Sequence, residues 1–121
     1  MNLELEDRVA LITASSKGIG RAVALALAKE GCNVAICARG GEILQRTRDE
    51  IAALGVDVLA VEADITEPDQ IDRLVDETTM NFGRIDVLVN NAGVAAEGHS
   101  LDDPDESWKL TYETNLFSVV R

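Results

Sequence analysis

Four short apolar runs divide the chain, and each has the composition of a buried β-strand. Residues 8–13 are RVALIT, 33–38 are NVAICA, 56–63 are VDVLAVEA and 85–90 are IDVLVN. The runs consist mainly of aliphatic side chains, several of them β-branched, and lack the strict alternation of a strand with one face in water. This pattern predicts four strands that are covered on both faces.

The segments between these runs carry apolar residues at helical spacing and have recognisable ends. Helices are predicted over residues 18–30, 41–54 and 66–83, and from residue 103 to the end of the chain. Gly31 and Gly55 follow the first two helices, as glycines that end helices do. Thr66 and Asp69 form a capping-box pattern, and Asp103 is an N-cap candidate. Strands that alternate with helices predict an α/β fold, a parallel sheet with helices on both faces.

The composition excludes several classes of function. A chain of 121 residues and 13.0 kDa suffices for one small domain. Hydrophobic residues make up 46%, enough for a core, whereas aromatic residues are 3% and the net charge is −11. We therefore expect no binding to nucleic acid or to an anionic membrane. No apolar run is long enough to span a bilayer, and the acidic N-terminus lacks the features of a signal peptide. These features favour a cytoplasmic protein.

Cysteine and histidine usage predicts neither a disulfide nor a metal site. Cys32 and Cys37 are five residues apart. On a strand that spacing separates them by about 16 Å, whereas a disulfide needs Cα atoms within about 7 Å. His99 is the one histidine and no CxxC motif occurs, so no zinc-ligand pattern is present.

The acidic charge is concentrated in the later part of the chain. Residues 1–40 carry five basic and four acidic side chains, a net charge of +1, and residues 41–121 carry six basic and eighteen acidic side chains, a net charge of −12. An anion-binding site is therefore expected in the first third.

A glycine-containing loop in that first third joins the first predicted strand to the first predicted helix. It runs from Thr13 to Gly20, and its candidate phosphate-binding residues are Ser15, Ser16, Lys17, Gly18, Ile19 and Gly20. Free N–H groups at the start of a helix and the positive end of its dipole attract a phosphate, and glycines let the backbone approach it closely. For the loop taken alone, the alternative is a tight strand–helix turn that binds nothing.

Further motifs give the chain a resemblance to a known family. Thr13, Gly18 and Gly20 match a TGxxxGxG loop; Asp64 follows the third strand; Asn90, Asn91, Ala92 and Gly93 form an NNAG motif after the fourth; and Asn115 lies in the fourth predicted helix. In this order and spacing the chain resembles the short-chain dehydrogenase/reductase family over nearly its whole length. Within that family it looks most like 3-oxoacyl-acyl-carrier-protein reductases and related sugar or alcohol dehydrogenases.

The resemblance implies a fold and a domain. Residues 1–121 are expected to form a dinucleotide-binding, Rossmann-type doubly wound parallel sheet that contains the first four βα units, with the C-terminal half absent. Ala14 departs from the family pattern, because it occupies the place of the first loop glycine. Alanine is readily accommodated there only with a negative φ, so we expect Ala14 to keep one in a slightly altered turn.

The resemblance also implies individual roles. Asp64 and its neighbour Ile65 are assigned to the adenine end of the cofactor. Asn90, Ala92 and Gly93 are expected along the cofactor, Asn91 supports the neighbouring strand, and Asn115 is the catalytic asparagine. Plainer roles remain open for the same residues: Asp64 as a cap of the next turn, Asn90 and Asn91 as turn formers, and Asn115 as an exposed helix residue.

The second strand points to the phosphorylated cofactor. Dinucleotide-binding folds read the adenosine ribose at the end of this strand, with an acidic residue for the 2′-hydroxyl of NAD or an arginine for the 2′-phosphate of NADP. Arg39 stands there with no carboxylate beside it, and Lys17 adds a second cation in the loop. We therefore predict NADP(H) as cofactor; the alternative is that both are ordinary surface charges.

Most of the family's catalytic residues do not occur in these 121 residues. Catalysis in the family requires a serine and a tyrosine followed four residues later by lysine. The one tyrosine, Tyr112, is followed at that spacing by Leu116. The chain alone is therefore expected to be inactive, and the strand at 85–90 is expected to have an open edge.

The sequence thus favours the cofactor-binding part of an NADP(H)-dependent oxidoreductase that transfers hydride between nicotinamide and a small carbonyl or alcohol substrate. The family implies a homo-oligomer, a dimer or tetramer, for the full-length protein. One alternative is a non-catalytic, truncated nucleotide-binding module. Another is a methyltransferase, against which Arg39 counts because such an enzyme needs an acidic residue at that position to bind a ribose diol.

Overall fold

The computed structural model describes residues 3–14 and 18–91. Within these ranges the chain alternates strictly between strands and helices: β1 (Val9–Ile12), α1 (Gly18–Lys29), β2 (Asn33–Ala38), α2 (Gly41–Ala52), β3 (Val58–Glu62), α3 (Pro68–Phe82) and β4 (Val87–Val89). The predicted alternation is confirmed for these seven elements. The helix predicted from residue 103 onward lies outside the described residues.

The four strands form one parallel sheet in the order β3-β2-β1-β4. β1 lies between two neighbours, so that Leu11 is in register with Ala35 of β2 and with Leu88 of β4. The chain first builds the sheet outward to β3 and then crosses back to place β4 on the other side of β1. This reversal makes the sheet doubly wound, and the predicted Rossmann-type α/β class is confirmed.

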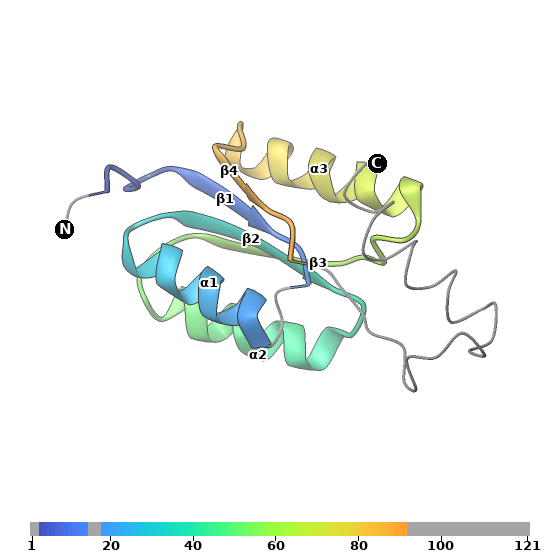
Figure 1. The fold of residues 1–121 in the computed structure, drawn as a ribbon, viewed down its shortest axis with the longest axis horizontal. Helices are drawn as coiled ribbons and strands as arrows, with labels where there is room; N and C mark the ends of the chain where they lie inside the picture. The colour runs from blue at the N-terminus through green and yellow to red at the C-terminus, as the bar shows by residue number, and fades with distance from the viewer. Residues whose placement is uncertain (1–2, 15–17, 92–121) are drawn as a thin grey trace, which may run out of the picture.

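Helices cover both faces of this sheet (Figure 1). α1 and α2 pack on one face against a core that includes Ala10 and Ile12, and α3 packs on the other through Leu74, near Leu11 and Cys37. Successive β1 side chains point to opposite faces, and all four are buried. Burial on both faces explains why this strand is continuously apolar.

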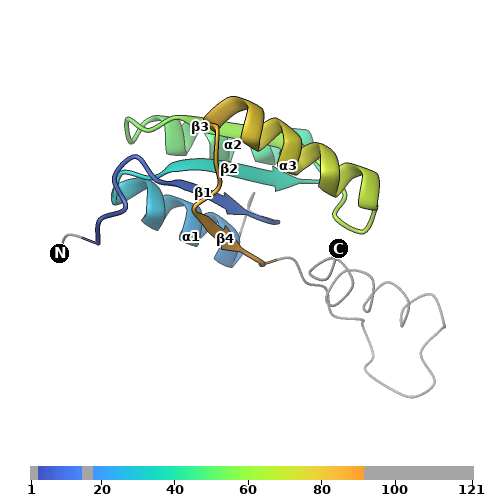
Figure 2. The ribbon, with the colours of Figure 1, turned by 90° about the horizontal axis from the view of Figure 1, so that it is seen from above.

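β4 forms one margin of the described sheet. Seen from above in Figure 2, it runs beside β1, and among the described strands β1 is its one neighbour. Leu88 in the middle of β4 is 56% exposed. The predicted open edge is therefore present in the described part of the chain. No helix in that part is long and apolar enough to cross a membrane.

The end of α1 has the geometry that its sequence predicts. Gly31 has a φ of +92°. Its N–H donates to the Ala28 carbonyl at 3.0 Å, and the Cys32 N–H donates to the Leu27 carbonyl at 3.1 Å. These two bonds form a Schellman motif, which satisfies carbonyls that the helix leaves unpaired and turns the chain into β2.

The start of α3 differs from the prediction. Its N-cap is Glu67, which makes no side-chain capping bond, and not Thr66. The Thr66 hydroxyl instead donates to Asp64 Oδ1 at 2.6 Å. The threonine side chain is engaged with the carboxylate of its own loop, two residues before it, and no side-chain capping bond forms at the N-cap of α3. The capping-box prediction was therefore wrong.

Six of the seven described elements are shorter than predicted, and β2 alone has its predicted bounds; the differences at β3, α2 and β4 show the pattern. β3 begins at Val58 and ends at Glu62, α2 ends at Ala52, and β4 covers residues 87–89. Side chains replace strand pairing at some of these ends: the Asp57 N–H, for example, donates to Asn33 Oδ1 at 3.0 Å. Both cysteines are buried and form no disulfide, as expected from their spacing.

Asp86 ties the start of β4 to the start of β1. The Val9 N–H donates to Asp86 Oδ2 at 2.8 Å, and the Asp86 N–H donates to the Val9 carbonyl at 2.9 Å. Arg84 Nε lies 2.9 Å from Oδ2, and Arg8 Nη1 lies 3.6 Å from Oδ1. The Val9 hydrogen bond is the main cause that lowers the pKa of Asp86; desolvation opposes it and the two guanidinium groups add to it.

Asp86→Asn is expected to destabilise the fold at neutral pH, because the amide loses the charge that Val9, Arg84 and Arg8 surround. The pKa of Asp86 is lower in the folded protein than its ordinary value of 3.8. Its stabilising contribution is therefore complete above that value and is lost as the pH falls through the folded-state pKa. Urea unfolding should show the largest deficit near neutral pH and a vanishing deficit in strong acid.

The exposed residue Asp72 on α3 provides the control, and Asp72→Asn should leave the free energy of unfolding nearly unchanged at every pH. A deficit for Asp86→Asn that stayed constant with pH would show that the carboxylate charge does not hold β4 in place.

Candidate cofactor site

The candidate residues lie where the parallel strands end. Thr13 directly follows β1, Arg39 directly follows β2, and Asn90 directly follows β4. Asp64 comes two residues after the end of β3. The carboxyl ends of parallel strands meet at one edge of the sheet, and in doubly wound sheets ligands bind outside this edge where the strand order reverses. Here the reversal lies at β1, between β2 and β4.

α1 begins at this edge with two glycines in different environments. Gly18, its first residue, has a φ of +64° and is exposed, and a β-carbon on it would meet no atom of the described residues within 4 Å. Gly20 is buried against the sheet, and between them the Ile19 residue is 76% exposed. The start of the helix is therefore open on its outer side and closely packed on its inner side. Ser15, Ser16 and Lys17 lie outside the described residues.

Ala14 does not keep the expected negative φ. Its φ is +50°, in the left-handed region that favours glycine. The Ala14 N–H donates to the Cys37 sulfur, and the Ala14 carbonyl accepts a hydrogen bond from Asn91 Nδ2 at 3.1 Å. Burial, the larger cause, raises the pKa of the Cys37 thiol, while this hydrogen bond acts in the opposite direction. Contacts from β2 and from the end of β4 thus hold the peptide in a conformation that alanine disfavours.

Asn91 also contacts the residue before Ala14. Its N–H donates to Thr13 Oγ1 at 3.0 Å, and the Thr13 N–H donates to the Val89 carbonyl at 3.1 Å. These bonds join the carboxyl ends of β1 and β4, consistent with the supporting role that the resemblance implied for Asn91. Asn90 is exposed beside this junction. Ala92, Gly93 and Asn115 lie outside the described residues.

Arg39 differs from the other arginines in the described residues. Six of them lie within 4.0 Å of an acidic partner: Arg8, Arg21, Arg46, Arg48, Arg73 and Arg84. Arg39 is exposed at the end of β2 and forms no such pair with any residue from 3–14 or 18–91. A guanidinium group without an internal partner is available to an anion from solution.

Asp64 is held in place by its own loop. Its Oδ1 accepts from the Thr66 hydroxyl at 2.6 Å and from the Thr66 N–H at 3.0 Å, and its own N–H donates to Gln70 Oε1 at 2.6 Å. The Thr66 hydroxyl is the main cause that lowers the pKa of Asp64, and the Arg39 guanidinium adds to it against the opposing effect of desolvation. Asp64 therefore both organises its turn and presents a carboxylate near Arg39.

The structure thus brings the described candidates to one edge, with Ile65 half-buried against the core under α3. Sequence reasoning missed Cys37 and Gln70, which position Ala14 and Asp64. The alternation of β2 places Cys37 on the face of Leu11, yet no local pattern shows that its sulfur accepts a loop N–H. Gln70 carries no signal beyond its place in the first turns of α3.

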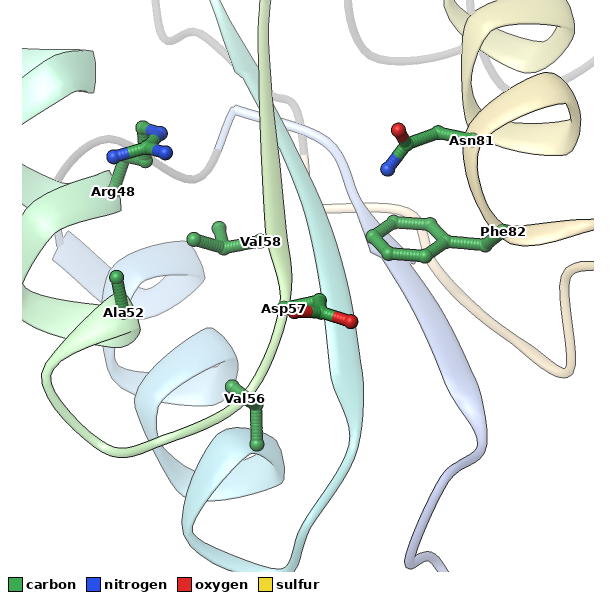
Figure 3. Close-up of a pocket in the computed structure, with 7 residues that line it drawn as sticks. All are labelled: Arg48, Ala52, Val56, Asp57, Val58, Asn81 and Phe82. Atoms are coloured by element: carbon green, nitrogen blue, oxygen red, sulfur yellow. The ribbon is translucent and has the colours of Figure 1, made fainter.

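An open pocket of about 390 Å³ lies at the other end of the sheet (Figure 3). It is lined by Arg48 and Ala52 of α2, Asp57 at the entry to β3, and Asn81 and Phe82 of α3, among others. This is the amino end of β3, so the pocket is separate from the strand ends that carry the candidate residues. Nor do residues 3–14 and 18–91 contain a group of three or more metal-ligating side chains.

Known proteins match this arrangement. A model of the short chain dehydrogenase family matches residues 8–121, and the chain therefore belongs to the short-chain dehydrogenase family of oxidoreductases. It is 40% identical over 111 residues to 3-oxoacyl-[acyl-carrier-protein] reductase FabG of Staphylococcus aureus, which covers 91% of this chain and 45% of that protein.

Solved structures agree with this assignment. A short-chain dehydrogenase/reductase from Mycobacterium marinum is 41% identical with a TM-score of 0.91, over 96% of this chain and 46% of the other. A variant of actinorhodin polyketide ketoreductase, solved with NADPH, is 40% identical with a TM-score of 0.91, over 95% of this chain and 44% of the other. The chain thus spans slightly less than half the length of these relatives.

Ala14→Gly is expected to stabilise the fold by about 0.5 to 1 kcal/mol. Glycine removes the steric cost of the positive φ, of the order of 1 to 2 kcal/mol, and part of this gain is offset by the greater freedom of glycine in the unfolded chain. Urea unfolding of the two proteins measures the difference.

A matched control replaces alanine where φ is helical. Ala26 is exposed in the middle of α1, and Ala26→Gly should destabilise the fold by about 1 kcal/mol. If Ala14→Gly also destabilised the fold to this extent, the conformation of Ala14 would not be strained.

Proposed function

We propose that residues 1–121 form the dinucleotide-binding domain of an NADP(H)-dependent carbonyl reductase or alcohol dehydrogenase similar to 3-oxoacyl-acyl-carrier-protein reductases. The family supports an oxidoreductase with a nicotinamide cofactor. NADPH is the cofactor named for one similar structure, the actinorhodin ketoreductase. A cytoplasmic location and a homo-oligomeric full-length enzyme, acting on a small carbonyl or alcohol substrate, complete the proposal.

The observation that carries the choice of cofactor is the guanidinium of Arg39, which forms no ion pair with an acidic side chain of residues 3–14 or 18–91. It is exposed directly after β2, at the place where dinucleotide-binding folds distinguish a 2′-phosphate from a 2′-hydroxyl. Six other described arginines are neutralised by acidic neighbours, so Arg39 is not one of a set of equivalent surface charges. We assign it to the 2′-phosphate.

The remaining residues fit the rest of such a cofactor. The open outer side of Gly18 leaves room at the positive end of α1 for the pyrophosphate, together with Ser15, Ser16, Lys17, Ile19 and Gly20. Asp64 and Ile65 are assigned to the adenine end. Asn90, Ala92 and Gly93, which follow β4, are assigned to contacts with the cofactor on the other side of β1. Asn115 is assigned to catalysis.

In this proposal the side chains and main chain of residues 1–121 bind the cofactor and orient it. When bound, the nicotinamide supplies or accepts the hydride. Arg39 and the start of α1 neutralise phosphate charge, and the bonds of Asn91 to Ala14 and Thr13 keep the loop after β1 in register with the end of β4. The two loops that would flank the cofactor are thereby fixed relative to each other before it binds.

Arg39→Ala is expected to weaken NADPH binding by about tenfold to a hundredfold, since hydrogen bonds to charged groups contribute about 1.5 to 3 kcal/mol. NADH binding should change little, because NADH has no 2′-phosphate. Arg39→Asp should reverse the preference. Fluorescence titration of each variant with both reduced cofactors measures the dissociation constants.

Arg46→Ala is the matched control. Arg46 is an exposed arginine paired with Glu42 on α2, so its loss should leave the ratio of the two dissociation constants unchanged. Equal binding of NADPH and NADH by the parent protein would refute the NADP(H) assignment, as would an Arg39→Ala variant that retained the parent's preference.

The 121-residue chain is expected to bind NADPH without reducing a β-ketoester. The serine and the tyrosine–lysine pair that the family uses for proton transfer to the substrate oxygen do not occur in it, and Tyr112 lacks the lysine four residues later. The absorbance of NADPH in the presence of a β-ketoester should therefore fall no faster than without protein. Turnover above this background would show that another group in the chain supplies the proton.

A further inference from the structure

The Glu62 side chain lies where β3 meets the start of α2. Glu62 is the last residue of β3, and in the sheet it stands beside Ala38, the last residue of β2. A β-carbon built on Gly41, the first residue of α2, would overlap Glu62 Oε1. The missing side chain at residue 41 therefore makes room for a carboxylate at the start of the helix.

No side-chain capping hydrogen bond forms at this helix start among the described residues. The N-cap of α2 is Gly40, which has no side chain to accept a bond from the first N–H groups. These groups have no partner within the helix, and the helix dipole adds to their attraction for negative charge. The Glu62 carboxylate provides such a charge, while Arg73 of α3 fixes the Glu62 main chain by donating to its carbonyl.

Arg39 lies in the same small region. It follows Ala38, the sheet partner of Glu62, and precedes the start of α2 by two residues. Its guanidinium also acts electrostatically on the carboxylate of Asp64, which follows β3. Neither Glu62 nor Asp64 lies within 4.0 Å of the guanidinium group, since no such ion pair occurs among the described residues. One cation and two carboxylates thus share the ends of β2 and β3.

We propose that Glu62 is a specificity-determining residue that weakens the binding of NADP(H) and leaves the binding of NAD(H) unchanged. This inference rests on the proposed function, because it takes Arg39 to be the partner of the 2′-phosphate. A phosphate group carries about −1.5 to −2 charges near neutral pH. Glu62 places a like charge at the helix start next to Arg39 and so offsets part of the attraction. NAD(H) has a neutral hydroxyl in that position and meets no such repulsion.

Removal of this charge should strengthen NADPH binding by about threefold to tenfold, the order of magnitude for exposed like charges that interact through water and are screened by salt. Because Glu62 is exposed, the gain should shrink as the salt concentration rises. Glu62→Gln keeps the size of the side chain and removes the charge, and Glu62→Ala removes both. The two variants should behave alike if charge is the cause.

The experiment is a fluorescence titration of the parent protein, Glu62→Gln and Glu62→Ala with NADPH and with NADH, at low and at high salt. Glu30→Gln is the control for net charge, since Glu30 follows α1 at the opposite end of the sheet. We expect both Glu62 variants to bind NADPH more tightly, with NADH unchanged and with no effect of Glu30→Gln. A role of Glu62 as a helix cap alone would lower the Tm and shift the two cofactors equally.

Equal shifts for NADPH and NADH, no shift, or weaker NADPH binding would overturn the inference. Arg39→Ala in the same titrations separates this failure from a failure of the proposed function. If Arg39→Ala weakens NADPH binding while the Glu62 variants do not strengthen it, the NADP(H) assignment stands and the role of Glu62 is refuted. If Arg39→Ala has no effect, the NADP(H) assignment itself fails.

Discussion

The pairing of β1 with β4 is the interaction on which the rest of the candidate site depends. β1 is buried on both faces, and it is the strand at which the order of the sheet reverses. β4 has only three residues, yet side chains hold it at both ends: Asp86 bonds to Val9 at the start, and Asn91 bonds to Thr13 and Ala14 at the finish. The loop after β1 takes its conformation from these contacts, so the proposed phosphate-binding turn is built partly by residues almost eighty positions later.

Charge distribution separates the binding edge from the rest of the surface. Elsewhere in the described residues arginines are matched with carboxylates along helices or between elements, as Arg46 is with Glu42 and Arg21 with Glu50. At the ends of β2 and β3, Arg39 lies near carboxylates without closing an ion pair with them. A guanidinium group that forms no ion pair within the protein can bind an anionic ligand, and nearby acidic groups determine how strongly it does so. The balance between attraction and repulsion is thus a local property of two strand ends.

The fold was largely predictable from the sequence, because its signals are local. Apolar runs mark the strands, and Gly31 ends a helix where its position indicates. The position of Arg39 after β2 also followed, since it needs only the end of that strand. Contacts between distant residues did not follow. The positive φ of Ala14 depends on Cys37 and Asn91, neither of which is close to it in sequence. One local prediction also failed: Thr66 has a capping pattern, but its hydroxyl donates to Asp64, two residues earlier.

The distance along the chain between β1 and β4 has a consequence for synthesis. β2 follows β1 closely, but the residues that pair with the other side of β1 come 76 to 78 positions after it. On the ribosome β1 can therefore join β2 early, while its second edge stays without a partner until residues 86–91 have emerged. Loop closure over such a separation is slow compared with local pairing. The strand at the centre of the finished sheet is thus a temporary edge of the nascent chain, and the loop after it acquires its shape last.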